Sequence, residues 1–169
     1  MTNTANKKFE LASPEFVTAF GDFMRKGLAK ENLTDVKFNY SWVATNAPAH
    51  LLKSAPANTY GRDAVGWSWS VRDGKVQVGN YPLPPEQNDF YLKTNYARLR
   101  EWIKLTDAQD AVFMGLKPGA DGKTVNTMQA FIEAGELELH YTDPAVIQTI
   151  GKLIVASDWR DSFFSRYVV

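Results

Sequence analysis

The sequence predicts an α+β fold in which helices pack on one face of a mostly antiparallel sheet. Two runs of alternating apolar and polar residues flank Asp73-Gly74, the pair that suits a two-residue hairpin turn. Apolar residues recur at helical spacing from Phe16 to Leu28 and again from Val146 to Ile154. Along the chain the pattern gives a helix, three strands, a fourth strand, two or three helices, a strand and a last helix.

The first helix is predicted over residues 14–29. Ser13 is a residue type that caps free N–H groups, and Pro14 suits the first helical position. Alternation of apolar and polar residues over 36–42 then predicts a strand with one solvent-exposed face. Residues 44–65 lack a sustained period and predict a long loop of the kind that forms lids or binding loops.

The central hairpin is the clearest local signal. Counting outward from Asp73-Gly74 pairs Val71 with Val76 and Trp69 with Val78 on one face. The polar residues between them fall on the other face, so the sheet is predicted to have one apolar and one polar side.

Capping residues place the later elements. A strand is predicted over residues 90–94, and Asn95 suits the start of a helix that carries Leu99, Trp102 and Ile103 inward. A capping-box pattern opens a short helix over residues 106–115, and Thr127 is predicted to cap the next helix, which ends at Gly135. A strand around Leu137 and Leu139 follows, and Asp143-Pro144 starts the last helix.

Composition limits the function classes. The chain has 169 residues, 44% of them hydrophobic and 22% charged, which favours a single domain over residues 1–169, with a frayed lead at 1–12 and an aromatic C-terminal tail at 157–169. Lys and Arg number 19, as do Asp and Glu, so no net field favours nucleic acid. The chain has no cysteine, no secretion signal and no apolar stretch of ~20 residues, so we expect a cytoplasmic protein without a transmembrane span.

Catalytic and metal-binding motifs are not found. The sequence has no HExxH, P-loop, GxGxxG or GxSxG pattern, and His50 and His140 have no catalytic spacing. Glu136 and Glu138 share a strand face, where a solvated surface explains them more simply than a shared proton or metal. The sequence therefore predicts no catalytic residue, no metal site and no cofactor.

Aromatic residues make up 13% of the chain, including five Trp and ten Phe, and they gather on the predicted helix stripes and sheet face. Such apolar stripes pack either into a solid core or around an apolar cavity, and the periodicity of the sequence does not decide between these two alternatives.

Three segments together resemble the sterol carrier protein type 2 domain family, over about residues 14–155. Residues 128–145 (MQAFIEAGELELHYTDPA) are similar to the family's late helix, Gly, strand and helix start, residues 67–76 (WSWSVRDGKV) to its central hairpin, and residues 90–94 (FYLKT) to its strand entering a helix. The chain departs from the family after the late strand, where it lacks the usual Gly-Asp, and in its longer loop at 44–65. The resemblance implies a five-stranded sheet under helices that enclose an apolar tunnel for fatty acids, sterols or acyl chains, without catalytic residues.

The leading hypothesis is a non-catalytic protein that binds or transfers a lipid-like apolar small molecule, such as a fatty acid or sterol, with the 44–65 loop or the aromatic tail over the opening. An alternative is an accessory subunit with a solid core, whose tail residues Trp159, Phe163 and Phe164 anchor a second copy or another protein. A weaker alternative is a small enzyme for an apolar substrate, with His50 or a carboxylate as base. The residues predicted to line the cavity are Phe20, Phe23, Met24, Trp69, Phe113, Met114, Met128, Phe131, Ile150 and Ile154.

Overall fold

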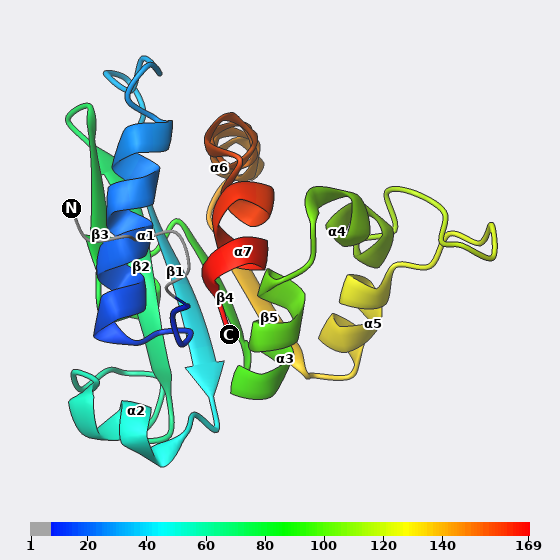
Figure 1. Ribbon diagram of the computed structural model, residues 1–169, viewed down its shortest axis with the longest axis horizontal. Helices are drawn as coiled ribbons and strands as arrows, with labels where there is room; N and C mark the ends of the chain where they lie inside the picture. The colour runs from blue at the N-terminus through cyan, green and yellow to red at the C-terminus, as the bar shows by residue number, and fades with distance from the viewer. Residues whose placement is uncertain (1–7) are drawn as a thin grey trace.

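The computed structural model describes residues 8–169 and confirms the α+β class (Figure 1). Five strands form one sheet in the order β3-β2-β1-β4-β5, in which β1 and β4 run parallel and all other neighbours are antiparallel. The elements in chain order are α1 (Pro14–Gly27), β1 (Phe38–Thr45), α2 (Ala49–Ser54), β2 (Val65–Arg72), β3 (Lys75–Gly79), a 3₁₀ turn (Pro85–Gln87), β4 (Phe90–Asn95), α3 (Tyr96–Ile103), α4 (Asp107–Phe113), α5 (Thr127–Glu133), β5 (Leu137–Tyr141), α6 (Pro144–Ser157), a π-helical turn (Arg160–Phe164) and α7 (Ser165–Tyr167).

The hairpin register is the one that the sequence predicts. Val71 pairs with Val76 and Trp69 with Val78, and both turn residues have positive φ, 51° at Asp73 and 71° at Gly74. A glycine adopts this conformation at no steric cost, so the Asp-Gly pair fixes which side chains of β2 face the core.

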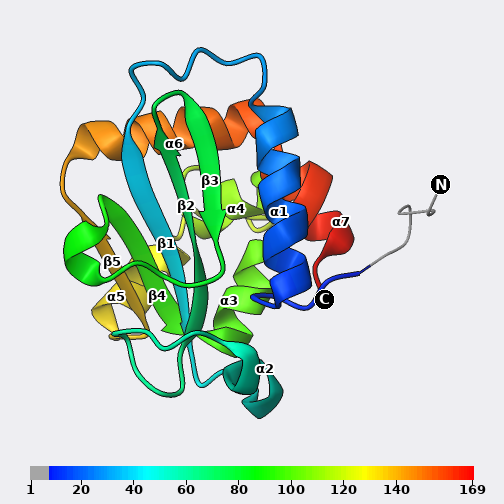
Figure 2. The same cartoon turned by 90° about the vertical axis from the view of Figure 1, so that its left-hand side faces the viewer.

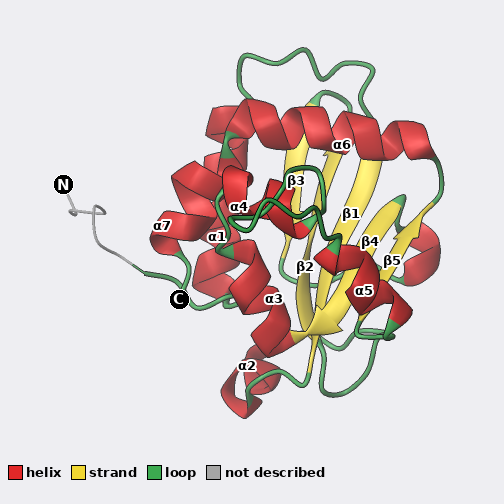
Figure 3. Ribbon diagram, turned by 90° about the vertical axis from the view of Figure 1, so that its right-hand side faces the viewer, coloured by secondary structure: helices red, strands yellow, loops and turns green. Residues whose placement is uncertain are grey.

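The two faces of the sheet are covered differently. Helices α3 to α6 lie over one face, seen in Figure 3, whereas the segment between β3 and β4 crosses the other, seen in Figure 2. In this crossing the backbone N–H of Leu83 donates to Oγ of Ser41 at 3.0 Å. The approach is close, because a Cβ on Gly66 would lie 3.2 Å from the ring of Pro82 and 2.2 Å from the carbonyl oxygen of Trp42. Only glycine fits there.

Several helix caps are as predicted. The side chains of Ser13, Asn95 and Asp143 accept hydrogen bonds from the first turns of α1, α3 and α6. Thr106 forms a complete capping box with Gln109. Thr127 was predicted to cap α5 but is its first residue, and the cap is Asn126, whose side-chain oxygen accepts from the N–H of Gln129 at 2.8 Å.

Two predictions about unstructured segments were wrong. The loop at 44–65 contains α2, which buries Leu51. Residues 8–12, the described part of the predicted frayed lead, are tied down because Phe9 hydrogen-bonds to Tyr167 at 2.6 Å and Leu11 is fully buried. An apolar side chain that can be covered stabilises even a segment without periodicity.

Candidate functional site

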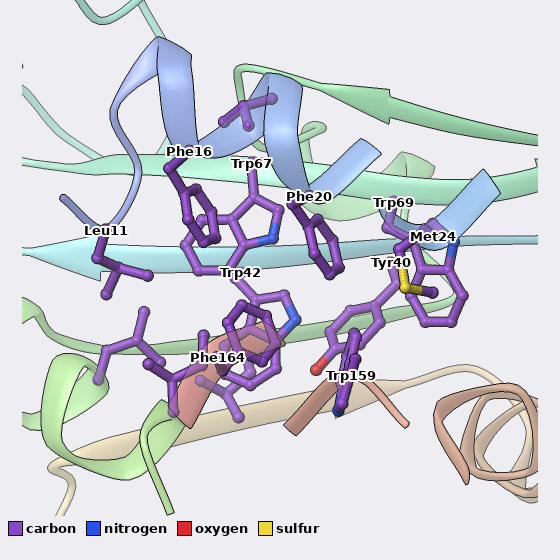
Figure 4. Packing of buried hydrophobic residues seen from close by; sticks show 14 of the residues in the cluster. Leu11, Phe16, Phe20, Met24, Tyr40, Trp42, Trp67, Trp69, Trp159 and Phe164 are labelled. Carbon is purple, nitrogen blue, oxygen red and sulfur yellow. The ribbon is translucent and has the colours of Figure 1, made fainter. Parts of the chain in front are cut away.

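Four of the ten predicted cavity residues lie in a closed aromatic core over β1 to β3. Phe20, Met24 and Trp69 are fully buried, and the ring of Phe23 packs 5.2 Å from that of Phe163. Figure 4 shows side chains of α1, of β1 and β2, and of the C-terminal segment meeting in this cluster. The members of this region, here called the closed half, include Phe16, Phe20, Met24, Trp67, Trp69, Trp159, Phe163 and Phe164.

The C-terminal aromatic residues fill this core from inside the same chain. Trp159, Phe163 and Phe164 are 2%, 3% and 1% exposed, and their rings lie 5.3–5.7 Å from the ring of Phe20. The prediction that they form an exposed anchor for a partner was therefore wrong. The tail is not a cover over an opening either, because the π-helical turn directs its rings into the sheet face.

The other predicted residues lie in a second region, over β4 and β5, here called the open half. Helices α4 and α5 bury none of their residues fully, although their sequences DAQDAVF and TMQAFIE are rich in apolar side chains. Phe113 packs 5.7 Å from Phe131, ring to ring. The half-buried apolar side chains of this region come from α4, α5, β5 and α6, and they are Phe113, Met114, Met128, Phe131, Ile132, Leu139, Val146 and Ile154, above the buried Leu137, Ile150 and Leu153.

Local sequence explains why this region is loosely covered. α4 and α5 have seven residues each. The glycine that follows the cap of each helix, Gly115 or Gly135, has a positive φ of 70° or 71°, which stops the helix. Residues 116–125 between the two helices contain no further helix or strand. In Figure 3 both helices lie over the sheet as a separate short layer between α3 and α6.

A chain of rings joins the two halves. Trp102 on α3 lies 5.2 Å from Phe113 on one side and 5.9 Å from Trp42 on the other. Its indole N–H donates to Oδ1 of Asp110 at 2.6 Å. Trp102 therefore fixes α4 to the edge of the closed core.

The same carboxylate neutralises a buried arginine. Arg160, whose side chain is 7% exposed, pairs with Asp110 at 3.0 Å and also donates to the carbonyl of Trp102 at 3.2 Å. Burial raises the pKa of the neighbouring Tyr40 well above its ordinary value, and the Arg160 guanidinium opposes part of that rise. These polar groups lie at the border between the closed and open halves.

Four of the five indole N–H groups have no hydrogen-bond partner among residues 8–169. They belong to Trp42, Trp67, Trp69 and Trp159, all of which are at most 2% exposed, whereas that of Trp102 is paired. An unpaired buried donor costs about 1–3 kcal/mol, so this is an unusual concentration of unmet donors.

Sequence reasoning missed the border residues Tyr40, Asp110 and Arg160. Tyr40 was predicted only as a strand residue, and Arg160 only as part of the tail. An arginine between Trp159 and a run of aromatic residues is a signal of a buried guanidinium, but its partner Asp110 is 50 positions away and sequence spacing does not reveal it.

Both histidines lie at the surface of the protein. The side chain of His50 is 63% exposed and pairs with Glu10 at 2.8 Å, and His140 is exposed and stacks on Tyr91. The weaker alternative of an enzyme required a histidine or carboxylate that lines an apolar pocket.

Glu136 and Glu138 each pair with a cation of their own. Glu136 pairs with Arg98 and Glu138 with Lys93, at 2.8 and 2.9 Å. The hydroxyl of Tyr91 also donates to Glu138, and this hydrogen bond, opposed by burial and helped by Lys93, lowers the pKa of Glu138.

A polar surface pocket of about 570 Å³ adjoins the open half at the start of α3. Lys93, Arg98, Glu136 and Glu138 line it, and the guanidinium of Arg98 also lies 4.0 Å above the ring of Phe131. A second pocket, of about 350 Å³, lies between α1 and β3. None of the ten predicted cavity residues lines either pocket.

Among residues 8–169, one group of acidic side chains is close enough to share a cation. Carboxylate oxygens of Asp107, Asp158 and Asp161 lie within 4.8 Å of one another. Asp161 already accepts from the N–H of Asp107 and Asp158 from the hydroxyl of Ser162. Burial, followed by repulsion from Asp161, raises the pKa of Asp107.

No helix in the described part of the chain combines the length and apolar character needed to cross a membrane. No protein-family model and no curated protein matches the chain.

Comparison with solved structures finds matches that span most of the chain at low sequence identity. They include the conserved hypothetical protein TT1886 of Thermus thermophilus (12% identity, TM-score 0.49, covering 94% of both chains). A crystal structure of sterol carrier protein 2 matches at 13% identity and a TM-score of 0.46, covering 88% of this chain and 98% of that one. The sterol carrier protein domain 2 of Helicoverpa armigera matches at 16% and 0.47, covering 88% and 94%. Each of these three matches spans at least 88% of this chain.

Proposed function

We propose that this protein binds a lipid-like apolar small molecule and holds or transfers it without chemical change. The observation that carries the proposal is the open half, where apolar side chains of α4, α5, β5 and α6 converge without covering one another. Natural chains with a solid core bury such stripes, as the closed half of this chain does.

The molecule would lie between the α4–α5 layer and the β4–β5 end of the sheet. In this proposal Phe113, Met114, Met128 and Phe131 form its outer wall, with Ile150 and Ile154 on α6 beside it. The remaining predicted residues, Phe20, Phe23, Met24 and Trp69, belong to the closed half and support the site from behind. Methionine and phenylalanine suit a wall that must fit flexible hydrocarbon.

Burial of hydrocarbon supplies enough free energy for useful affinity. Each CH₂ removed from water contributes ~0.8 kcal/mol, so a ten-carbon chain contributes about 8 kcal/mol before the cost of ordering it. The net charge of zero gives no long-range attraction to an anionic headgroup or membrane. Attraction between the protein and a lipid would therefore come from contact between apolar surfaces.

The test compares two adjacent positions on α6. Ile154 is half-buried and faces the open half, whereas Val155 is 74% exposed. Ile154→Asn and Val155→Asn place the same amide on the two sides of one helix, and binding of a fluorescent fatty-acid analogue is titrated in both. We expect Ile154→Asn to weaken binding at least tenfold and Val155→Asn to leave it unchanged.

Circular dichroism and urea unfolding of both variants separate lost binding from lost folding. Native mass spectrometry of protein purified without detergent provides a second readout, in which we expect a bound small molecule. Empty protein in that spectrum, together with no uptake of fatty-acid, sterol or alkyl probes by the wild type, would refute the proposed function.

A further inference from the structure

Two unpaired indole N–H groups lie where the open half meets the aromatic core. The rings of Trp42 and Trp159 are 6.1 Å apart, and the ring of Tyr40 lies 5.5 Å from the first and 6.5 Å from the second. Figure 4 shows the hydroxyl of Tyr40 and the indole nitrogen of Trp159 on the side of the cluster turned away from α1. Three polar groups thus gather in one buried place.

These groups do not fully satisfy one another. The Trp42 side chain acts on the Tyr40 hydroxyl as a weak hydrogen-bond donor and lowers the pKa of Tyr40, but no hydrogen bond of ordinary length and angle joins Nε1 of Trp42 to that oxygen. Nε1 of Trp159 has no partner among residues 8–169. An indole nitrogen can only donate, so what completes this site has to be an acceptor.

Ring contacts link this place to the open half. Trp42 contacts Trp102, and Trp102 contacts Phe113 of α4. On the sheet, Tyr40 contacts the half-buried Phe90 of β4, ring to ring at 4.7 Å. A molecule held against α4 and β4 would reach the two indoles by inserting its inner end between these rings.

The charges nearby favour a neutral acceptor over an anion. Arg160 is the cation next to Tyr40, and Asp110 already pairs with it at 3.0 Å. A carboxylate bound there would be buried beside Asp110 without a cation of its own, which is costly. A ketone or ester oxygen accepts two hydrogen bonds and brings no charge.

We propose that the polar end of the bound molecule is a neutral carbonyl group that accepts hydrogen bonds from the indole N–H groups of Trp42 and Trp159. This inference rests on the proposed function and specifies the class of ligand: an apolar molecule with a ketone or ester group at one end.

The test uses three probes that differ only at this end. In 2-decanone the carbonyl is present, in 2-methyl-1-decene a CH₂ group replaces the oxygen, and decanoate carries a charge. Proton–nitrogen spectra of ¹⁵N-tryptophan protein give one indole signal for each of the five Trp, assigned with Trp42→Phe and Trp159→Phe. Trp102, which already donates to Asp110, is the internal control.

We expect 2-decanone to move the indole protons of Trp42 and Trp159 downfield and the alkene to leave them in place. The ketone should bind about tenfold more tightly than the alkene, as one hydrogen bond to a buried unpaired donor allows, and more tightly than decanoate. In Trp42→Phe the preference for the ketone over the alkene should fall severalfold while alkene binding persists.

Equal affinities and equal indole shifts for ketone and alkene would overturn the carbonyl inference and leave the proposed function standing. Preference for decanoate would also overturn it. If none of the three probes binds to a folded protein, the proposed function itself fails.

Discussion

The closed and open halves are built from the same kinds of side chain but differ in how completely they are covered. Phe20 in the closed half is fully buried beneath rings from the C-terminal segment. Among residues 8–169, Phe131 in the open half has one ring neighbour and an arginine above it. The difference teaches that apolar content does not identify a binding region, whereas apolar side chains that the chain leaves half-covered do.

The largest expected effect tests this contrast with one substitution type. Phe20→Ala removes a fully buried ring and should lower the free energy of unfolding by about 3–5 kcal/mol. Phe131→Ala removes a half-buried ring and should cost about 1 kcal/mol, because much of its surface is not covered by the chain. Urea unfolding measures both.

The order of the two variants should be reversed for ligand affinity. Phe131→Ala is expected to weaken binding of an alkyl probe more than Phe20→Ala does, although it costs less unfolding free energy. Equal unfolding costs for the two variants would mean that the open half is as solid as the closed one.

The ion pair at the border is the next test. Arg160→Met leaves the carboxylate of Asp110 buried without its cation and should destabilise the protein by about 3 kcal/mol. The double variant with Asp110→Leu removes both charges and should recover part of that loss, because the indole N–H of Trp102 then loses its acceptor. A single variant as stable as the wild type would show that the pair does not hold α4 against the core.

Alkaline pH should weaken the closed half through Tyr40. Because burial raises its pKa in the folded protein, the unfolded chain gives up this proton first, near pH 10, and stability falls as the pH rises further. One such group costs up to ~1.4 kcal/mol per pH unit. Burial also raises the pKa values of Tyr91 and Tyr96 to about 12 each, so the wild type has several such contributions.

Urea unfolding between pH 9 and 12 should therefore show a shallower alkaline loss in Tyr40→Phe than in the wild type. Identical slopes would place the Tyr40 hydroxyl in contact with water.

Local sequence signals predict most of the fold because each depends on neighbouring residues. The Asp73-Gly74 turn, the Asn95 cap and the Thr106 capping box all form as their patterns indicate. How completely each apolar side chain is buried is harder to predict, since it depends on residues far apart in the chain. Trp159 packs against Phe20, which is 139 positions earlier, and no pattern around either residue shows this contact.

The candidate site is predictable in part for the same reason. Helical spacing places Met128 and Phe131 on an apolar stripe, as it does Phe20 and Met24. The stripes look alike in sequence, and only the packed structure separates the covered one from the half-covered one.

The four methionines give the most direct test of the account. Met24 lies in the closed half and is fully buried, Met114 and Met128 lie half-buried in the open half, and Met1 is outside the described residues. Carbon-13 methyl spectra are recorded while 2-methyl-1-decene is added, with signals assigned by Met→Leu variants. The account predicts that the signals of Met114 and Met128 move to saturation while that of Met24 stays in place. Movement of Met24 with Met114 and Met128 unchanged would contradict it.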